Sequence, residues 1–177
     1  TMGALFYTPD LNRPVDFEEL NQSYGGRLTW QASEKNKVYF FTDYQDLYGS
    51  HGRAANPTTA PEAQNQARLR PSGIVQGSWQ SVQTNKLLLE AGAGWMIWHN
   101  HSYLQPGVPL DAISILESST GRRFNAPLNH YGGGDWKDPW VVDRYVQRFG
   151  MSYVTGSHSY KAGVQIEQGA INGGIRK

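Results

Sequence analysis

Six segments of this chain alternate apolar and polar residues, and short polar turns join them in pairs. The first pair, residues 27–33 and 37–44, flanks a turn at 34–36. Residues 74–82 and 86–101 flank 83–85, and residues 145–154 and 158–168 flank 155–157. Alternation with period two predicts strands, and a two- to four-residue polar turn between two such runs predicts an antiparallel hairpin.

Long excursions rich in Gly, Pro and Asn, at residues 46–73 and 102–140, separate these hairpins. The sequence therefore predicts an all-β domain over residues 1–177. It is an antiparallel meander of about six to eight long strands, forming a partial or small barrel or a sandwich. The long loops lie at one end and the short turns at the other, an asymmetry typical of outer-membrane barrels. We also expect a short hairpin within 112–124, and either a short helix or irregular structure over 57–70.

The two faces of the predicted strands differ in character. In residues 87–101 the odd positions are mostly Leu, Ala, Trp, Ile and His. The even positions hold Glu90, two glycines and an asparagine together with Leu88, Met96 and Trp98. The chain holds ten Tyr, six Trp and six Phe, and aromatics cluster towards the ends of the apolar stripes. Such a stripe either meets lipid or forms the core of a soluble fold. The length of residues 87–101 favours lipid, because globular strands usually have ~5–6 residues.

Composition excludes several functions. The net charge is +1, and the basic residues near 68–70 and 122–123 are too few for a nucleic-acid surface. There is no cysteine, which rules out disulfides and thiolate metal sites. No apolar run approaches the roughly 18 residues of a spanning helix.

Strand-and-turn motifs along residues 6–170 resemble those of large TonB-dependent outer-membrane receptors with a carboxypeptidase-regulatory-like domain. The motifs are RLTWQASEKNK (27–37), DYQ (43–45), PEA (61–63), RLRPSG (68–73), TNKLLLEAG (84–92), ESSTG (117–121) and SYVTGSHSYKAG (152–163). The resemblance implies strands and extracellular loops that contribute to uptake of a small-molecule or oligosaccharide ligand. It implies no nucleic-acid partner, and localisation in the outer membrane.

The same resemblance implies a 22-stranded barrel with a plug and a TonB-box peptide, neither of which is recognisable here. Six strands are also fewer than the usual minimum of about eight for a spanning barrel. We therefore expect a segment of a larger barrel. Its open strand edges predict a homo-oligomer when it is isolated, and a soluble form would need the apolar face to be buried.

An alternative is a soluble all-β hydrolase or metal-dependent enzyme. His99 and His101 form a His-x-His pair whose side chains project from one side of a strand about 7 Å apart. That spacing suits a divalent metal such as Zn or Cu, with His130, Asp135 or Glu117 as third ligand. The simpler interpretation, which we favour, is that the two histidines are polar aromatic residues at the end of a strand and that they hold no cofactor.

Two further sets of residues offer weaker candidates. Glu90 and Glu167 lie on polar faces and are the candidates for a catalytic acid and base, although pairing with a nearby Lys or Arg is the simpler expectation. No nucleophile motif is present, so the sequence does not decide whether the chain is an enzyme. A carbohydrate-binding module or a Ca site is the last alternative, built from a loop with two tryptophans. Its residues are Trp136, Trp140, Asp135 and Asp138.

Overall fold

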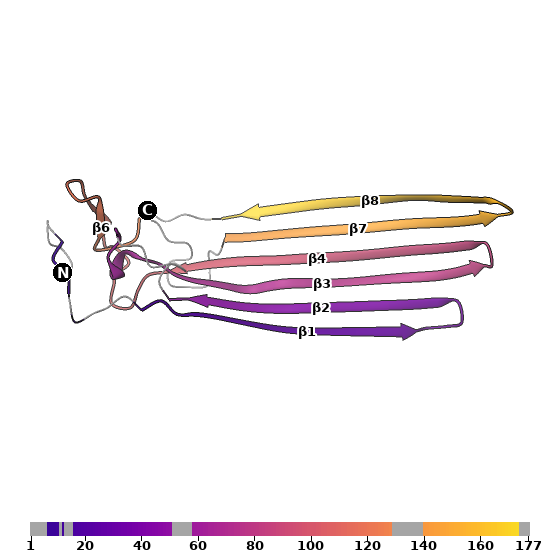
Figure 1. Ribbon diagram of the computed structural model, residues 1–177, viewed down its shortest axis with the longest axis horizontal. Coiled ribbons are helices and arrows are strands. Elements are labelled where there is room, and N and C mark those ends of the chain that lie inside the picture. Colours follow the sequence, from indigo (N-terminus) through magenta and orange to yellow (C-terminus); the bar gives the residue numbers. More distant parts are fainter. Residues whose placement is uncertain (1–6, 11, 13–15, 51–57, 129–139, 174–177) are drawn as a thin grey trace.

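The protein is a long, open antiparallel sheet capped at one end by a small irregular unit (Figure 1). This computed structural model describes residues 7–10, 12, 16–50, 58–128 and 140–173. Six strands form the main sheet in the order β1-β2-β3-β4-β7-β8. Their bounds are β1 Glu19–Gln31, β2 Asn36–Gly49, β3 Gln66–Thr84, β4 Leu87–Tyr103, β7 Trp140–Thr155 and β8 His158–Asn172.

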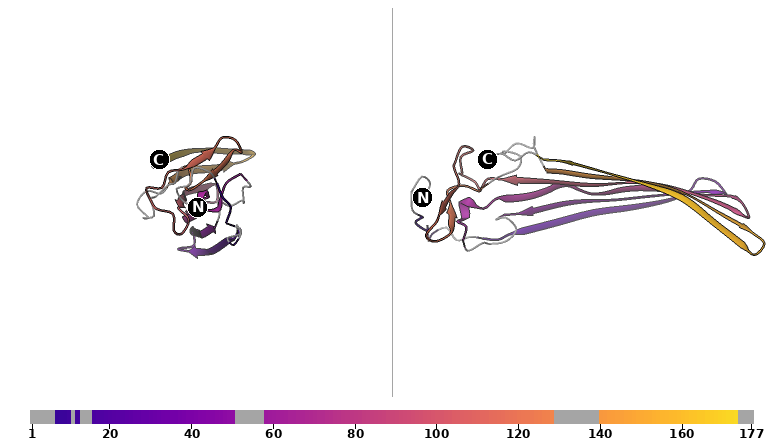
Figure 2. Two further views of the ribbon diagram at one scale, coloured as in Figure 1. Left: turned by 90° about the vertical axis from the view of Figure 1, so that its left-hand side faces the viewer. Right: turned by 90° about the horizontal axis from the view of Figure 1, so that it is seen from above.

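The expected all-β antiparallel meander is confirmed, and the sheet does not close into a barrel. The strands run side by side from the cap to the tight turns and twist together (Figure 2). They are longer than predicted. The excursions at 46–73 and 102–140 contribute the added ends of β2, β3 and β4, and residues 19–26, 140–144 and 169–172 extend β1, β7 and β8. Strands β1 and β8 form the two edges (Figure 1), and neither pairs with another described strand on its outer side.

Local hydrogen bonds explain two of the three tight turns, and a glycine explains the third. Ser33 and Asn36 exchange backbone hydrogen bonds of 3.2 Å, and the Ser33 hydroxyl also accepts from the Asn36 side-chain amide at 2.8 Å. The Thr84 hydroxyl accepts from the backbone N–H of Leu87 at 3.1 Å. Gly156 has φ +54°, a left-handed conformation that glycine adopts without steric cost. These turns lie together at the end away from the cap (Figure 1).

Strand β3 carries a bulge near its start. Its register with β4 shifts between Leu69 and Ser72, at a proline that cannot donate to the ladder. Gly73 follows with φ +150°, and a Cβ there would collide with the backbone carbonyl of Asp43. The bulge lets β3 bend where the sheet enters the cap.

The cap comprises η1 (Pro61–Ala63), β5 (Ile115–Glu117) and β6 (Arg122–Phe124). The hairpin β5-β6 confirms the one expected within 112–124. The backbone N–H of Ala60 donates to the Arg123 carbonyl at 2.8 Å, which joins the η1 segment to β6. All buried apolar residues of the described chain belong to the cap or adjoin it: Ala60, Ala63, Leu69, Phe124 and Ala126.

The long part of the sheet therefore has no buried apolar core of its own among the described residues. In the same part of the chain, no helix is long and apolar enough to cross a membrane.

Candidate functional site

The strand register assigns every side chain of the main sheet to one of two faces, because residues directly opposite in an antiparallel pair project to the same side. One row across the sheet pairs Arg27 with Phe41, Gln76, Gly94 and Val146 in turn. We call the face that carries this row the polar face. The next row, shifted by one residue, pairs Leu28 with Phe40 and continues to Ile166. It lies on the opposite side, which we call the apolar face.

Large side chains of the apolar face are exposed. Leu28 retains 62% of its accessible surface, Val164 57% and Ile166 54%. Soluble monomers rarely expose contiguous apolar patches above a few hundred Å². This face continues across all six strands, which indicates a surface that contacts another apolar surface.

Aromatic residues mark both ends of the apolar face. Trp30, Trp79, Tyr153 and Tyr160 lie towards the tight turns, whereas Tyr24, Tyr44, Trp95 and Tyr145 lie towards the cap. The residues between them are mostly aliphatic. Trp and Tyr favour the boundary between an apolar and an aqueous phase, because each ring has an apolar body and a polar tip.

A carboxylate interrupts the apolar face beside the cap-side aromatics. Asp143 Oδ1 accepts a hydrogen bond of 3.3 Å from the indole N–H of Trp95. His99 Nε2 lies 3.4 Å from the same oxygen, an ion-pair contact that does not meet hydrogen-bond geometry. Trp95 stacks on Tyr145, with ring centroids 5.9 Å apart. This group forms a polar boundary to the apolar face.

A second polar group lies further towards the cap. Arg68 donates to both carboxylate oxygens of Asp46, at 3.1 and 2.8 Å, and Arg70 Nη1 is 3.5 Å from Asp46 Oδ2. His101 Nε2 is 2.9 Å from the Arg70 carbonyl oxygen, and its ring stacks with Tyr103. The apolar face therefore ends in charged and hydrogen-bonded residues on its cap side.

In the cap itself, Tyr7 packs its ring against Phe124, with centroids 5.7 Å apart, beneath the guanidinium of Arg122. Burial, assisted by the negative charge of Glu62, raises the pKa of the Tyr7 hydroxyl above its ordinary value. The phenol is therefore neutral at physiological pH and serves packing.

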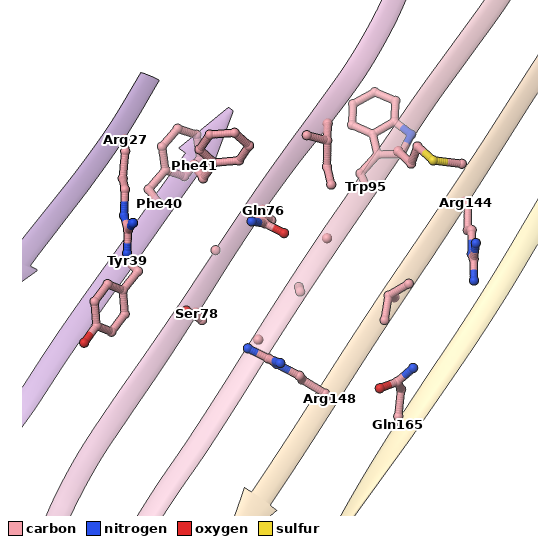
Figure 3. Close-up of a pocket in the computed structure, with 17 residues that line it drawn as sticks. Arg27, Tyr39, Phe40, Phe41, Gln76, Ser78, Trp95, Arg144, Arg148 and Gln165 are labelled. Atoms are coloured by element: carbon pink, nitrogen blue, oxygen red, sulfur yellow. The ribbon is translucent and has the colours of Figure 1, made fainter. Parts of the chain in front are cut away.

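The polar face holds a hollow of about 870 Å³ near the middle of the sheet (Figure 3). Its lining residues come from all six strands of the main sheet. Arg27, Tyr39, Gln76, Ser78, Arg148 and Gln165 are the polar residues that the polar-face register directs into it, with Arg144 at one end. Glycines of β3 and β4 form much of the floor. The volume falls within the range of about 300–1,000 Å³ that is typical of small-molecule sites.

The structure gives the two predicted metal-binding histidines separate partners. His99 approaches Asp143, whereas His101 bonds the Arg70 carbonyl. The carboxylate of Glu117, a predicted third ligand, instead accepts from the Thr120 hydroxyl at 2.6 Å in the β5-β6 turn. Among the described residues no three His, Asp or Glu side chains form a group that could hold a metal ion. His130 and Asp135 lie outside the described residues.

Glu90 and Glu167 share the polar face but do not meet. Glu90 accepts a hydrogen bond of 3.0 Å from Gln80, and Glu167 pairs with Arg144. They are two strands and four register positions apart, which corresponds to about 16 Å between backbones. Carboxylates that act together on one glycosidic bond lie at most about 9.5 Å apart. The arrangement therefore favours the structural interpretation: Glu167 pairs with an arginine, whereas Glu90 bonds a glutamine in place of the expected Lys or Arg.

Trp140 is the one member of the predicted carbohydrate-binding loop that the structure describes. It begins β7 and is half-buried, paired in register with Asn100. Trp136, Asp135 and Asp138 lie outside the described residues, so the loop site stays a prediction.

Sequence reasoning did not connect Arg27, Arg148 and Asp143 with the groups in which the structure places them. Each arginine occupies a polar-face position of an alternating run, so the sequence predicts which face it lies on but not that the two side chains converge. Only the cross-strand register brings Asp143 to Trp95 and His99.

Comparison with known proteins gives no match to this chain among protein-family models, curated proteins or solved structures. The fold and the two faces of the sheet are therefore the basis for any statement of function.

Proposed function

We propose that this chain forms part of the wall of an outer-membrane β-barrel of the TonB-dependent receptor type. In this arrangement the apolar face meets lipid, the polar face lines the lumen, and the cap side faces the exterior, where it contributes to ligand uptake. The observation that carries the proposal is the exposed apolar face with aromatic residues at both ends. In transmembrane barrels, an outward apolar band lies between two aromatic girdles, and the interior is polar.

Strand length supports the proposal. The six strands have 13 to 19 residues, whereas about 9–11 tilted residues cross the hydrocarbon core. Each strand is therefore long enough to span and to project beyond the membrane. The surplus coincides with the polar group around Asp46, which lies on the cap side of the aromatics, and it begins near Asp143, which lies in the same register row as Tyr24 and Tyr44.

The asymmetry of the connections also supports it. Tight turns lie at one end, and long connections lie at the other, as in barrels with short periplasmic turns and longer extracellular loops. The open edges of β1 and β8 supply positions where neighbouring strands of the wall would pair. The resemblance of the strand-and-turn motifs described above supports the choice of receptor type in this proposal.

A pair of neighbouring substitutions tests the membrane placement. Ile166 on the apolar face and Gln165 on the polar face are consecutive, exposed residues of β8. Ile166→Arg is expected to destabilise the protein folded in lipid vesicles by about 2–4 kcal/mol, because it places a charge in hydrocarbon. Gln165→Arg is expected to have little effect. Folding would be followed by vesicle flotation and urea titration, and equal tolerance of both changes would contradict the proposal.

The receptor type has a separate test in the DNA that flanks the coding region. The proposal expects the reading frame to continue into a plug and into further strand-and-turn pairs. Stop codons close on both sides would contradict it.

A further inference from the structure

The hollow on the polar face has an uneven charge. Three arginines, Arg27, Arg144 and Arg148, line it, and no carboxylate does. Arg144 pairs with Glu167 just beyond the hollow. Within the described ranges, neither the Arg27 nor the Arg148 side chain forms an ion pair or a hydrogen bond. Two guanidinium groups therefore lack an ion-pair partner among the described residues.

The position of Arg148 depends on a glycine of the neighbouring strand. A Cβ at Gly92 would lie 2.9 Å from Arg148 Nε and 3.4 Å from its Cγ. The side chain therefore lies across β4 and directs its guanidinium towards β3 and Ser78 (Figure 3). On the other side, Arg27 extends from β1 over β2 towards Tyr39 (Figure 3). The two arginines thus reach into the hollow from opposite sides.

The strand spacing sets the distance between these charges. Four inter-strand spacings separate β1 from β7, and each arginine reaches inward by about one of them. The remaining interval is two spacings, or roughly 10 Å, at ~4.8 Å per spacing. Between the arginines lie Gln76 and Ser78, which can bond uncharged polar atoms.

We propose that the hollow binds an elongated small molecule with two carboxylates about 10 Å apart, one held by Arg27 and the other by Arg148. A guanidinium matches a carboxylate with two parallel hydrogen bonds. Two carboxylates match the two guanidinium groups that lack an ion-pair partner, whereas two phosphate groups would carry more negative charge than these two groups. The inference goes beyond the proposed function, because it concerns only the polar face and does not require lipid on the other side.

Linear dicarboxylates of different length test the spacing. The full chain would be titrated by calorimetry with azelate, whose carboxylates are far apart, and with malonate, which has the same charge but is too short to reach both arginines. The medium is whichever buffer or detergent gives a β-sheet circular dichroism spectrum. Azelate is expected to bind at least about tenfold more tightly than malonate. Equal affinity for the two, or for inorganic phosphate, would overturn the proposal.

Variants locate the site. Arg27→Gln and Arg148→Gln are each expected to weaken azelate binding about tenfold or more, the effect of losing one charge-assisted contact. Gly92→Ala should weaken it by displacing Arg148. The control is Lys161→Gln, which removes a positive charge from the same face outside the hollow. Circular dichroism of each variant separates loss of binding from loss of folding. Unchanged binding in both arginine variants, or an equal loss in Lys161→Gln, would overturn the proposal.

Discussion

Trp95 and Tyr145 stack across β4 and β7 with their ring planes 13° apart, although both side chains are more than one-third exposed. A stacked pair in a soluble core would be covered by other residues. Here the pair lies on the surface, at the boundary where the apolar face meets Asp143, which accepts from the Trp95 indole. This is the arrangement expected of an interfacial anchor, with apolar rings facing one phase and the N–H facing the other.

The first prediction concerns this stack. A double-mutant cycle with Trp95→Leu and Tyr145→Leu should give a coupling energy of about 0.5–1.5 kcal/mol, the usual worth of an aromatic pair beyond its buried area. The measurement is urea unfolding of the lipid-inserted protein. A coupling energy near zero would mean that the two rings do not act together.

The second prediction compares two ion pairs. Asp46→Ala leaves Arg68 and Arg70 without their shared, largely buried carboxylate, and should destabilise the fold by about 1–3 kcal/mol. Glu167→Ala breaks a pair whose side chains are almost half exposed, and should cost less than about 1 kcal/mol. Unfolding midpoints under the same conditions check the order. The reverse order would show that the group around Asp46 does not stabilise the cap side of the sheet.

The third prediction concerns two glycines. Gly73→Ala should destabilise the protein by about 1–3 kcal/mol, since the added Cβ meets the Asp43 carbonyl at a left-handed φ. Gly26→Ala is the control, because a Cβ there meets nothing within 4 Å. That change should be neutral or slightly stabilising. If both variants unfold at the same denaturant concentration, the bulge in β3 is not the constraint described here.

The hairpins could be predicted from the sequence because alternation and turn residues are local signals. Residues 37–44 and 86–101 alternate clearly, and both proved to be strands. The strand ends were missed where local signals oppose a strand. Gly25 and Gly26 lie within β1, and the proline after Arg70 lies within β3, where pairing with neighbouring strands outweighs low intrinsic propensity.

The candidate site could be predicted less well, for the same reason. Placing Arg148 on the polar face needs only period two, but its position over Gly92 depends on the register of β4 with β7. Likewise, Glu90 and Glu167 were correctly placed on polar faces, yet their separation depends on how many strands lie between them. Distances across a sheet are set by pairing, which a single sequence does not contain.

The most direct test of the central claim is a cysteine scan of β2, made simple by the absence of native cysteine. Residues 38–43 would be replaced one at a time by cysteine, labelled with an environment-sensitive fluorophore and inserted into vesicles containing a lipid-borne quencher. The account predicts quenching and blue-shifted emission at Val38, Phe40 and Thr42. It predicts water-like emission at Tyr39, Phe41 and Asp43. Uniform emission along the strand, or quenching at the odd positions instead, would contradict the claim that the apolar face meets lipid.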